Sequence, residues 1–292
     1  MKLRLSILAA LCATALTVPA AALAASGPVY YYVALGDSVA AIDNGYPQRL
    51  LSTLKNEMPN LQLVNLACPG ETTSSMISGY PATPPPIPGT PHFGPPCQTY
   101  PHGSQLAEAV AFLSTHRPFV RLVTIDIGAG DFADCLAALN FSDDCRTSHQ
   151  SQMTSNLATI LNQLVAAAGD NVPIVGMNYY DAFAGLWVLG DVLFGGDDNL
   201  AQALALASVG FNVQANDALE ATYAAADDPW ADVETAFAVT DFTDTAELPG
   251  FGPVPLSVFN ACTLTLLCSN LDIHPNADGS AVIARAFEQV LP

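Results

Sequence analysis

Basic side chains are scarce in this sequence of 292 residues. It has 8 lysines and arginines against 27 aspartates and glutamates, a formal net charge of −19, and Lys55 is the only lysine after residue 24. So acidic a surface repels the phosphates of nucleic acids and of anionic membranes, and it favours solubility. We therefore expect no nucleic-acid partner. The hydrophobic fraction of 51% excludes a disordered chain and is ample for one large core.

Long apolar runs are also scarce, and the only one lies at the N-terminus. Residues 1–24 begin with Lys2 and Arg4, continue through an alanine-rich apolar stretch and end in small residues. This order is typical of a secretory signal peptide. A retained membrane anchor is the alternative, but Pro19 interrupts the run. Because no other stretch could span a bilayer, we expect a signal peptide over 1–24 and one domain over 25–292. That domain would be secreted, to the extracellular space or the periplasm, without stable membrane insertion.

Cysteine and histidine spacings typical of zinc sites are absent, since there is no C-x-x-C and no H-x-x-x-H. Of the seven cysteines, Cys12 lies in the predicted signal peptide, which leaves an even number in the exported chain. An even number in this setting favours disulfides, and six cysteines allow fifteen pairings. We expect no metal site. Pairing neighbours in the sequence predicts the bridges Cys68–Cys97, Cys135–Cys145 and Cys262–Cys268.

The chain does contain a regular alternation of strand and helix patterns. Such alternation predicts a single α/β domain, with a parallel sheet covered by helices on both faces. Two segments stand apart: the proline-rich residues 79–103 predict an irregular loop, and the apolar, glycine-punctuated residues 185–196 predict an insertion or lid. Strands are predicted at 29–35, 61–66, 119–127, 172–180 and 231–239, and helices at 46–58, 105–113, 148–168, 200–226 and 277–290.

The first predicted strand, residues 29–35, runs directly into Gly36-Asp37-Ser38. A serine at the carboxyl end of a strand lies where open α/β sheets bind their ligands. The alternative is a plain turn with a helix N-cap, which Asp and Ser also suit. The alternative is preferable unless a base and oxyanion donors occur elsewhere in the chain.

Such groups follow other predicted strands. Gly70 follows the second strand, Gly130 follows the third, and Asp272 and His274 lie in the last loop before the closing helix. In a parallel sheet these loops meet Ser38 at one edge. Histidine is the base suited to activating a serine at neutral pH. Backbone N–H groups at glycine turns are suitable donors to an oxyanion.

These residues resemble the SGNH, or GDSL-type, serine hydrolases, and in particular a secreted bacterial subgroup of esterases and lipases. Gly36-Asp37-Ser38 is similar to the nucleophile block, ACPGETT around Gly70 to the glycine block, and Asp272-Ile273-His274-Pro275 to the histidine block. The resemblance covers nearly all of the mature chain. It implies a flavodoxin-like three-layer fold and no cofactor or metal.

The resemblance also implies the roles of single residues. Ser38 would be the nucleophile, His274 the general base and then acid, and Asp272 the third member of the triad. The backbone N–H groups of Ser38 and Gly70 would hold the oxyanion. Gly130 stands where the family has an asparagine whose amide is a further donor.

Two departures from the family pattern lead to expectations of their own. Gly130 supplies no amide, which predicts a slow enzyme rather than an inactive one, and Gly130→Asn is expected to raise turnover. Many relatives place an aspartate three residues before the histidine, where this chain has Leu271. Either the Asp272 carboxylate or the Leu271 carbonyl would therefore orient His274.

The sequence thus predicts a secreted serine esterase or lipase, monomeric, acting on a small-molecule or lipid ester. Two alternatives remain open. An acyltransferase would use the same acyl-enzyme with another acceptor. A non-catalytic carbohydrate- or lipid-binding protein could retain a degenerate hydrolase fold, a possibility raised by Gly130.

Overall fold

The computed structural model describes residues 27–79 and 100–291. The predicted signal peptide, most of the proline-rich segment and Cys97 lie outside these ranges, so the pairing Cys68–Cys97 stays a prediction. Within the described residues no helix combines the length and the apolar character that crossing a bilayer requires.

A five-stranded parallel sheet with the order β2-β1-β3-β4-β5 forms the centre of the molecule. β1 lies in the interior of the sheet, between β2 and β3, and its last five residues are buried, which explains why its sequence is continuously apolar. The order is that of flavodoxin-like sheets, so the predicted fold class is confirmed. The strands are β1 Tyr30–Gly36, β2 Leu61–Asn65, β3 Val120–Asp126, β4 Ile174–Met177 and β5 Trp230–Ala231.

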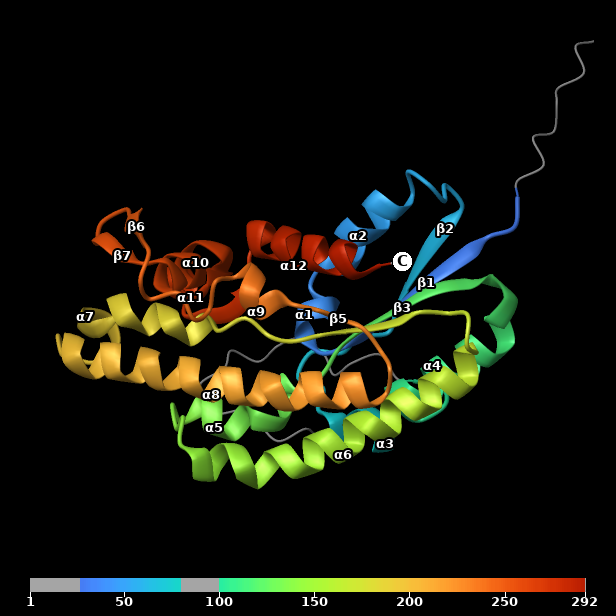
Figure 1. Ribbon diagram of the computed structural model, residues 1–292, viewed down its shortest axis with the longest axis horizontal. Helices are drawn as coiled ribbons and strands as arrows, with labels where there is room; N and C mark the ends of the chain where they lie inside the picture. Colours follow the sequence, from blue (N-terminus) through green and yellow to red (C-terminus); the bar gives the residue numbers. More distant parts are fainter. Residues whose placement is uncertain (1–26, 80–99, 292) are drawn as a thin grey trace, which may run out of the picture.

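Helices cover both faces of the sheet, which gives three layers (Figure 1). α2 and α12 pack together over one face, while α4 and α6 pack together over the other, with α8 beside α6. Apolar residues of these helices form the main core with the strands. The layer helices are α2 Tyr46–Leu54, α3 Thr73–Ser78, α4 Gln105–His116, α6 Asp143–Ala168, α8 Asp198–Ala225 and α12 Ala277–Val290.

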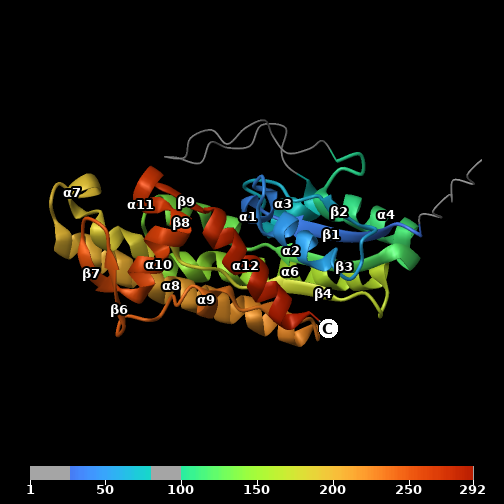
Figure 2. The ribbon, with the colours of Figure 1, turned by 90° about the horizontal axis from the view of Figure 1, so that it is seen from above.

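Short elements gather beyond the carboxyl ends of the strands, where α7, α10, β6 and β7 extend the molecule (Figures 1 and 2). They include two antiparallel pairs, β6–β7 and β8–β9, that the strand–helix pattern did not predict. The short helices are α1 Ser38–Ala41, η1 Arg117–Phe119, η2 Ala129–Phe132, α5 Ala133–Ala137, η3 Ala182–Val188, α7 Gly190–Leu193, α9 Val233–Ala236, α10 Leu256–Leu264 and α11 Leu267–Asn270. The additional strands are β6 Thr245–Leu248, β7 Gly252–Pro255, β8 Thr265–Leu266 and β9 Asp272–Pro275.

The prediction of a strand at 231–239 was wrong for most of its length. β5 ends at Ala231, and Asp232 caps α9 by accepting a hydrogen bond from the backbone N–H of Thr235 (2.9 Å). The capped turn replaces strand geometry although the residues are apolar enough for either. The strand predicted at 172–180 is also shorter, because it ends at Met177.

Candidate active site

Ser38 lies at a sharp turn between β1 and α1. Gly36 ends β1 with a φ of +131°, and a Cβ atom there would lie 2.1 Å from the backbone oxygen of Asp126. Asp37 then caps α1, since its Oδ1 accepts a hydrogen bond from the N–H of Val39 (2.9 Å). Ser38 is therefore the first residue of the helix. The turn-and-cap interpretation is correct for Asp37, and it places Ser38 at the sheet edge.

The structure brings Ser38, His274 and Asp272 into one hydrogen-bonded chain. His274 Nε2 lies 2.8 Å from Ser38 Oγ, and His274 Nδ1 lies 2.5 Å from Asp272 Oδ1. The same Oδ1 accepts the backbone N–H of His274 at 2.9 Å. Of the two groups left open by the sequence, the Asp272 carboxylate is therefore the one hydrogen-bonded to Nδ1. A hydroxyl, an imidazole and a carboxylate in this order can activate the hydroxyl as a nucleophile.

The loop that carries His274 is held from two sides. β9 pairs with β8, and the Cys262–Cys268 disulfide links α10 to α11 immediately before β9. On the other side, the hydroxyl of Tyr180 donates to the backbone oxygen of Ile273 (3.0 Å). Tyr180 follows β4, so a residue far from the histidine loop in the sequence fixes this loop to the sheet edge.

Gly70 and Gly130 line the same cavity as Ser38. Gly70 has a φ of +76°, and the turn that follows it packs directly against Gly130. The two turns are also joined by Asp131, whose carboxylate accepts the N–H of Thr73 (2.8 Å) and its hydroxyl (2.6 Å). The residues predicted for the oxyanion thus lie together.

The expectation that Gly130→Asn raises turnover does not agree with this packing. A Cβ atom at residue 130 would lie 2.2 Å from the backbone oxygen of Glu71, with nothing flexible between them. No side chain fits unless one of the two turns moves. Residue 130 must therefore be glycine for steric reasons. The same glycine also leaves the site without the amide donor that the family pattern has there.

Gln105 supports the turn that carries Ser38, and the sequence analysis did not single it out. Its side chain binds both backbone groups of Gly36, accepting from N–H at 2.7 Å and donating to the carbonyl at 3.0 Å. It also donates to Glu71 Oε2 at 2.9 Å. Burial raises the pKa of Glu71 to about 7, although hydrogen bonds from Ser75 and Gln105 oppose the rise. Because the partners lie far apart in the chain, no local pattern could have indicated this contact.

A cavity of about 780 Å³ opens beside Ser38 and His274. Its walls come mainly from η2, α5, η3 and α8, and most of its lining is apolar. Leu193 of α7 also lines it and is 40% exposed, and α7 lies in the segment predicted as an insertion or a lid. Apolar side chains along the cavity are Phe132, Leu136, Leu139, Phe141, Phe183, Leu186, Phe211 and Leu219.

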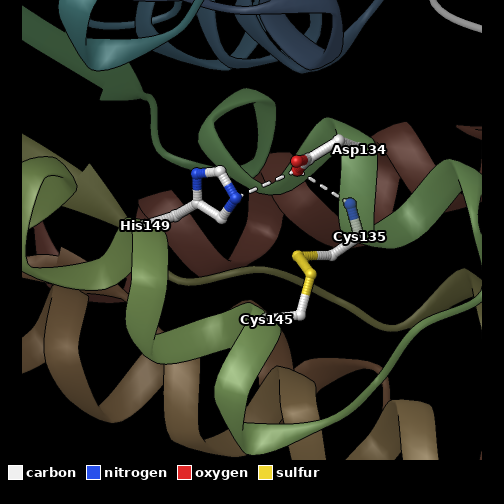
Figure 3. Close-up of side chains that lie close together, drawn as sticks. All are labelled: Asp134, Cys135, Cys145 and His149. Atoms are coloured by element: carbon white, nitrogen blue, oxygen red, sulfur yellow. Dashed lines mark hydrogen bonds and ion pairs between the residues drawn. A yellow bond between two sulfur atoms is a disulfide. The ribbon is translucent and has the colours of Figure 1, made fainter.

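One cluster near the cavity has the composition of a metal site (Figure 3). Potential ligand atoms of Asp134, Cys135, Cys145 and His149 lie within 4.8 Å of one another. The two sulfur atoms are joined in a disulfide, and His149 Nε2 lies 3.1 Å from Asp134 Oδ1. Sulfurs bonded to each other are not thiolate ligands, so the cluster ties α5 to the start of α6 instead.

Comparisons with solved structures return esterases and lipases among their matches. An extracellular lipase from Streptomyces rimosus is 18% identical with a TM-score of 0.50, over 90% of this chain and 100% of that one. A variant of an acetyl xylan esterase from Geobacillus stearothermophilus is 14% identical (TM-score 0.48), over 89% and 93%. A phospholipase A1 from Streptomyces albidoflavus is 16% identical (TM-score 0.45), over 90% and 100%. No curated protein matches the sequence.

A comparison with protein families gives a more direct result. The model of the GDSL-like lipase/acylhydrolase family matches residues 34–282, which include Ser38, both glycine turns and His274. This match spans most of the chain, and the fold agrees with it. The chain therefore belongs to the GDSL-like lipase/acylhydrolase family.

Proposed function

We propose that the protein is an exported serine hydrolase that cleaves carboxylic esters with an apolar acyl group. The observation that carries the proposal is the hydrogen-bonded chain Ser38–His274–Asp272 at the side of an apolar cavity. Family membership supports ester hydrolysis as the reaction class. Export is supported by the signal-peptide pattern of residues 1–24 and by two disulfides in the described residues.

In the first half of the reaction, Ser38 Oγ attacks the ester carbonyl while His274 Nε2 accepts the hydroxyl proton. Asp272 holds the imidazole in the tautomer with a proton on Nδ1 and stabilises the imidazolium that forms. The tetrahedral intermediate places its negative charge near the backbone N–H groups of Ser38 and Gly70.

In the second half, the imidazolium gives its proton to the leaving alcohol, and the acyl group remains on Ser38 Oγ. A water molecule then attacks the acyl carbonyl as His274 takes a proton from it. The bond between the acyl carbon and Ser38 Oγ breaks, His274 returns the proton to Oγ, and the acid is released. The apolar walls of the cavity receive the acyl chain, because burying each CH₂ group contributes about 0.8 kcal/mol.

Two measurements test this proposal together. A fluorophosphonate probe should label the wild-type protein at Ser38 and should not label Ser38→Ala. A panel of p-nitrophenyl esters from acetyl to decanoyl should show hydrolysis by the wild type, with the higher kcat/KM on chains longer than acetyl. Absence of both labelling and hydrolysis in the folded protein would support the non-catalytic binding protein instead.

A further inference from the structure

Two buried carboxyl groups lie beneath Ser38, and the reaction scheme above uses neither. Asp37 is 4% exposed and Asp126 is fully buried. Asp37 follows β1 and Asp126 ends β3, and the N–H of Asp37 donates to the backbone oxygen of Asp126 (2.9 Å). Their side chains are in hydrogen-bonding contact with each other. Carboxyl groups form such a bond only when one of them carries a proton.

The other hydrogen-bond donors to the two carboxyl groups are of the same two kinds. Asp37 accepts the N–H of Val39 (2.9 Å) and the hydroxyl of Tyr179 (2.8 Å). Asp126 accepts the N–H of Ala40 and the hydroxyl of Tyr46, both at 3.0 Å. Each carboxyl group therefore binds one backbone N–H of α1 and one phenol. Together they fix the first turn of the helix that begins with Ser38.

No lysine or arginine is among the groups that face this pair from the described residues. Among these groups His274 is the one that can become a cation, and its charge opposes the rise in the pKa of Asp37. Burial raises the pKa of both aspartates, and the charge of Asp37 raises the pKa of Asp126 further. The titratable groups that face the pair are Tyr32 of β1, Tyr46 of α2, Glu71 after β2, Asp131 after β3, Tyr179 and Tyr180 after β4, Tyr223 of α8 and His274 of β9.

We propose that Asp37 and Asp126 share one proton at neutral pH and act as a positioning pair that fixes Ser38 against His274. The shared proton joins the end of β1 to the end of β3 directly below the nucleophile turn. The pair then carries one negative charge, which faces His274. Loss of the shared proton places two negative charges in contact, and their repulsion displaces the first turn of α1 together with Ser38.

The decisive variant is Asp126→Asn, because its amide cannot be deprotonated. Its oxygen can keep the N–H of Ala40 while the hydroxyl of Tyr46 turns to accept, which leaves the NH₂ group able to donate to Asp37 in place of the shared proton. The kcat of the wild type should fall at alkaline pH when the pair loses its proton. In Asp126→Asn this alkaline limb should move to higher pH, whatever the absolute kcat. An alkaline limb that stays where it is in the wild type would overturn the proposal.

Asp131→Asn is the matched control. Asp131 is a half-buried carboxylate at the same sheet edge, and its oxygens accept hydrogen bonds from the N–H and the hydroxyl of Thr73. The amide can keep its oxygen on the N–H of Thr73 and turn its NH₂ group to the Thr73 hydroxyl, so the variant removes another carboxylate at this edge and should leave the alkaline limb unmoved. If Asp131→Asn moved the limb by the same amount as Asp126→Asn, the effect would not belong to the pair.

An infrared measurement keeps the proposal testable should Asp126→Asn fail to fold. The wild type should keep a carbonyl band of a protonated carboxylic acid at a pH well above the pKa of Glu71, which is about 7. The band should persist in Asp131→Asn, and its absence from the wild type would overturn the proposal. This readout needs no ester hydrolysis. A protein that hydrolyses no ester yet shows the band would refute the proposed function and leave the shared proton in place.

Discussion

The two sides of the cavity beside Ser38 and His274 are built in different ways. On the sheet side, the turns that carry Ser38, Gly70 and Gly130 pack backbone against backbone and are joined by hydrogen bonds of Gln105 and Asp131. On the helix side, the walls are apolar side chains, and some of them, such as Leu193, are partly exposed. Moving the closely packed backbone on the sheet side would destabilise the fold, whereas walls made of apolar side chains tolerate substitutions that change their shape. We infer that the sheet side determines the reaction and the helix side determines which esters enter.

Removing the nucleophile or its base should have the largest effect of any change on the sheet side. Ser38→Ala and His274→Ala should each lower kcat roughly 10⁴–10⁶-fold, because the two groups act as a unit. The double variant should lose little more than either single variant. Steady-state kinetics on a short-chain ester, with circular dichroism as the control for folding, measures this. Wild-type turnover in either folded variant would contradict the assignment of the triad.

Gly130→Asn tests whether the sheet side is as tightly packed as its contacts indicate. The new Cβ atom meets the Glu71 carbonyl at 2.2 Å, so the free energy of unfolding should fall by about 1–3 kcal/mol. We expect kcat to fall as well, because either turn must move. The matched control is Gly210→Asn, at an exposed position of α8 with nothing within 4 Å, and its Tm should change little. A higher kcat in Gly130→Asn would restore the expectation drawn from the sequence.

Glu71→Gln tests the buried charge on the sheet side through its pH dependence. The folded state binds the proton of Glu71 more tightly than the unfolded chain does, since the pKa rises from 4.5 to about 7. The stability of the wild type should therefore decline as the pH rises from about 5 to 7, by on the order of 1 kcal/mol per pH unit. Glutamine cannot ionise, so the variant should gain stability relative to the wild type over this window.

Urea unfolding of both proteins at pH 5 and at pH 8 measures this difference. Replacing the exposed Glu57 by glutamine serves as the control, because its carboxylate stays in water whether or not the chain is folded. A stability difference between wild type and Glu71→Gln that is constant with pH would show that Glu71 does not hold its proton in the folded state.

The smallest effect is expected on the helix side, from Leu193→Ala. This side chain lines the cavity at its exposed edge, so its loss should remove contacts with a long acyl chain worth about 1 kcal/mol. The kcat/KM on a decanoyl ester should fall roughly five-fold, while that on an acetyl ester should hardly change. Val192→Ala is the matched control, since Val192 is its neighbour, is 65% exposed and does not line the cavity. Equal losses on both esters would place Leu193 outside the acyl-binding wall.

The sequence by itself determined the order of the main strands and helices, and from it the sheet. Apolar runs such as that of β1 and helical stripes such as that of α6 depend on which face each residue buries, and this is visible locally. The resemblance to the family was visible as well, because its motifs are short and each lies at the end of a strand. Local patterns gave the wrong prediction where a helix cap decided the structure. Asp232 caps α9, so the apolar residues that follow it form this helix and do not extend β5.

Only the tertiary structure decided the contacts within the site. Asp272 was distinguished from Leu271 as the partner of His274 by the path of β9, and the room at Gly130 was set by Glu71 on another loop. The bond from Tyr179 to Asp37 joins residues 142 positions apart. Such contacts depend on where separate loops meet at the sheet edge, to within fractions of an ångström. A sequence pattern places each loop at that edge, but packing of the whole core sets the distances between loops.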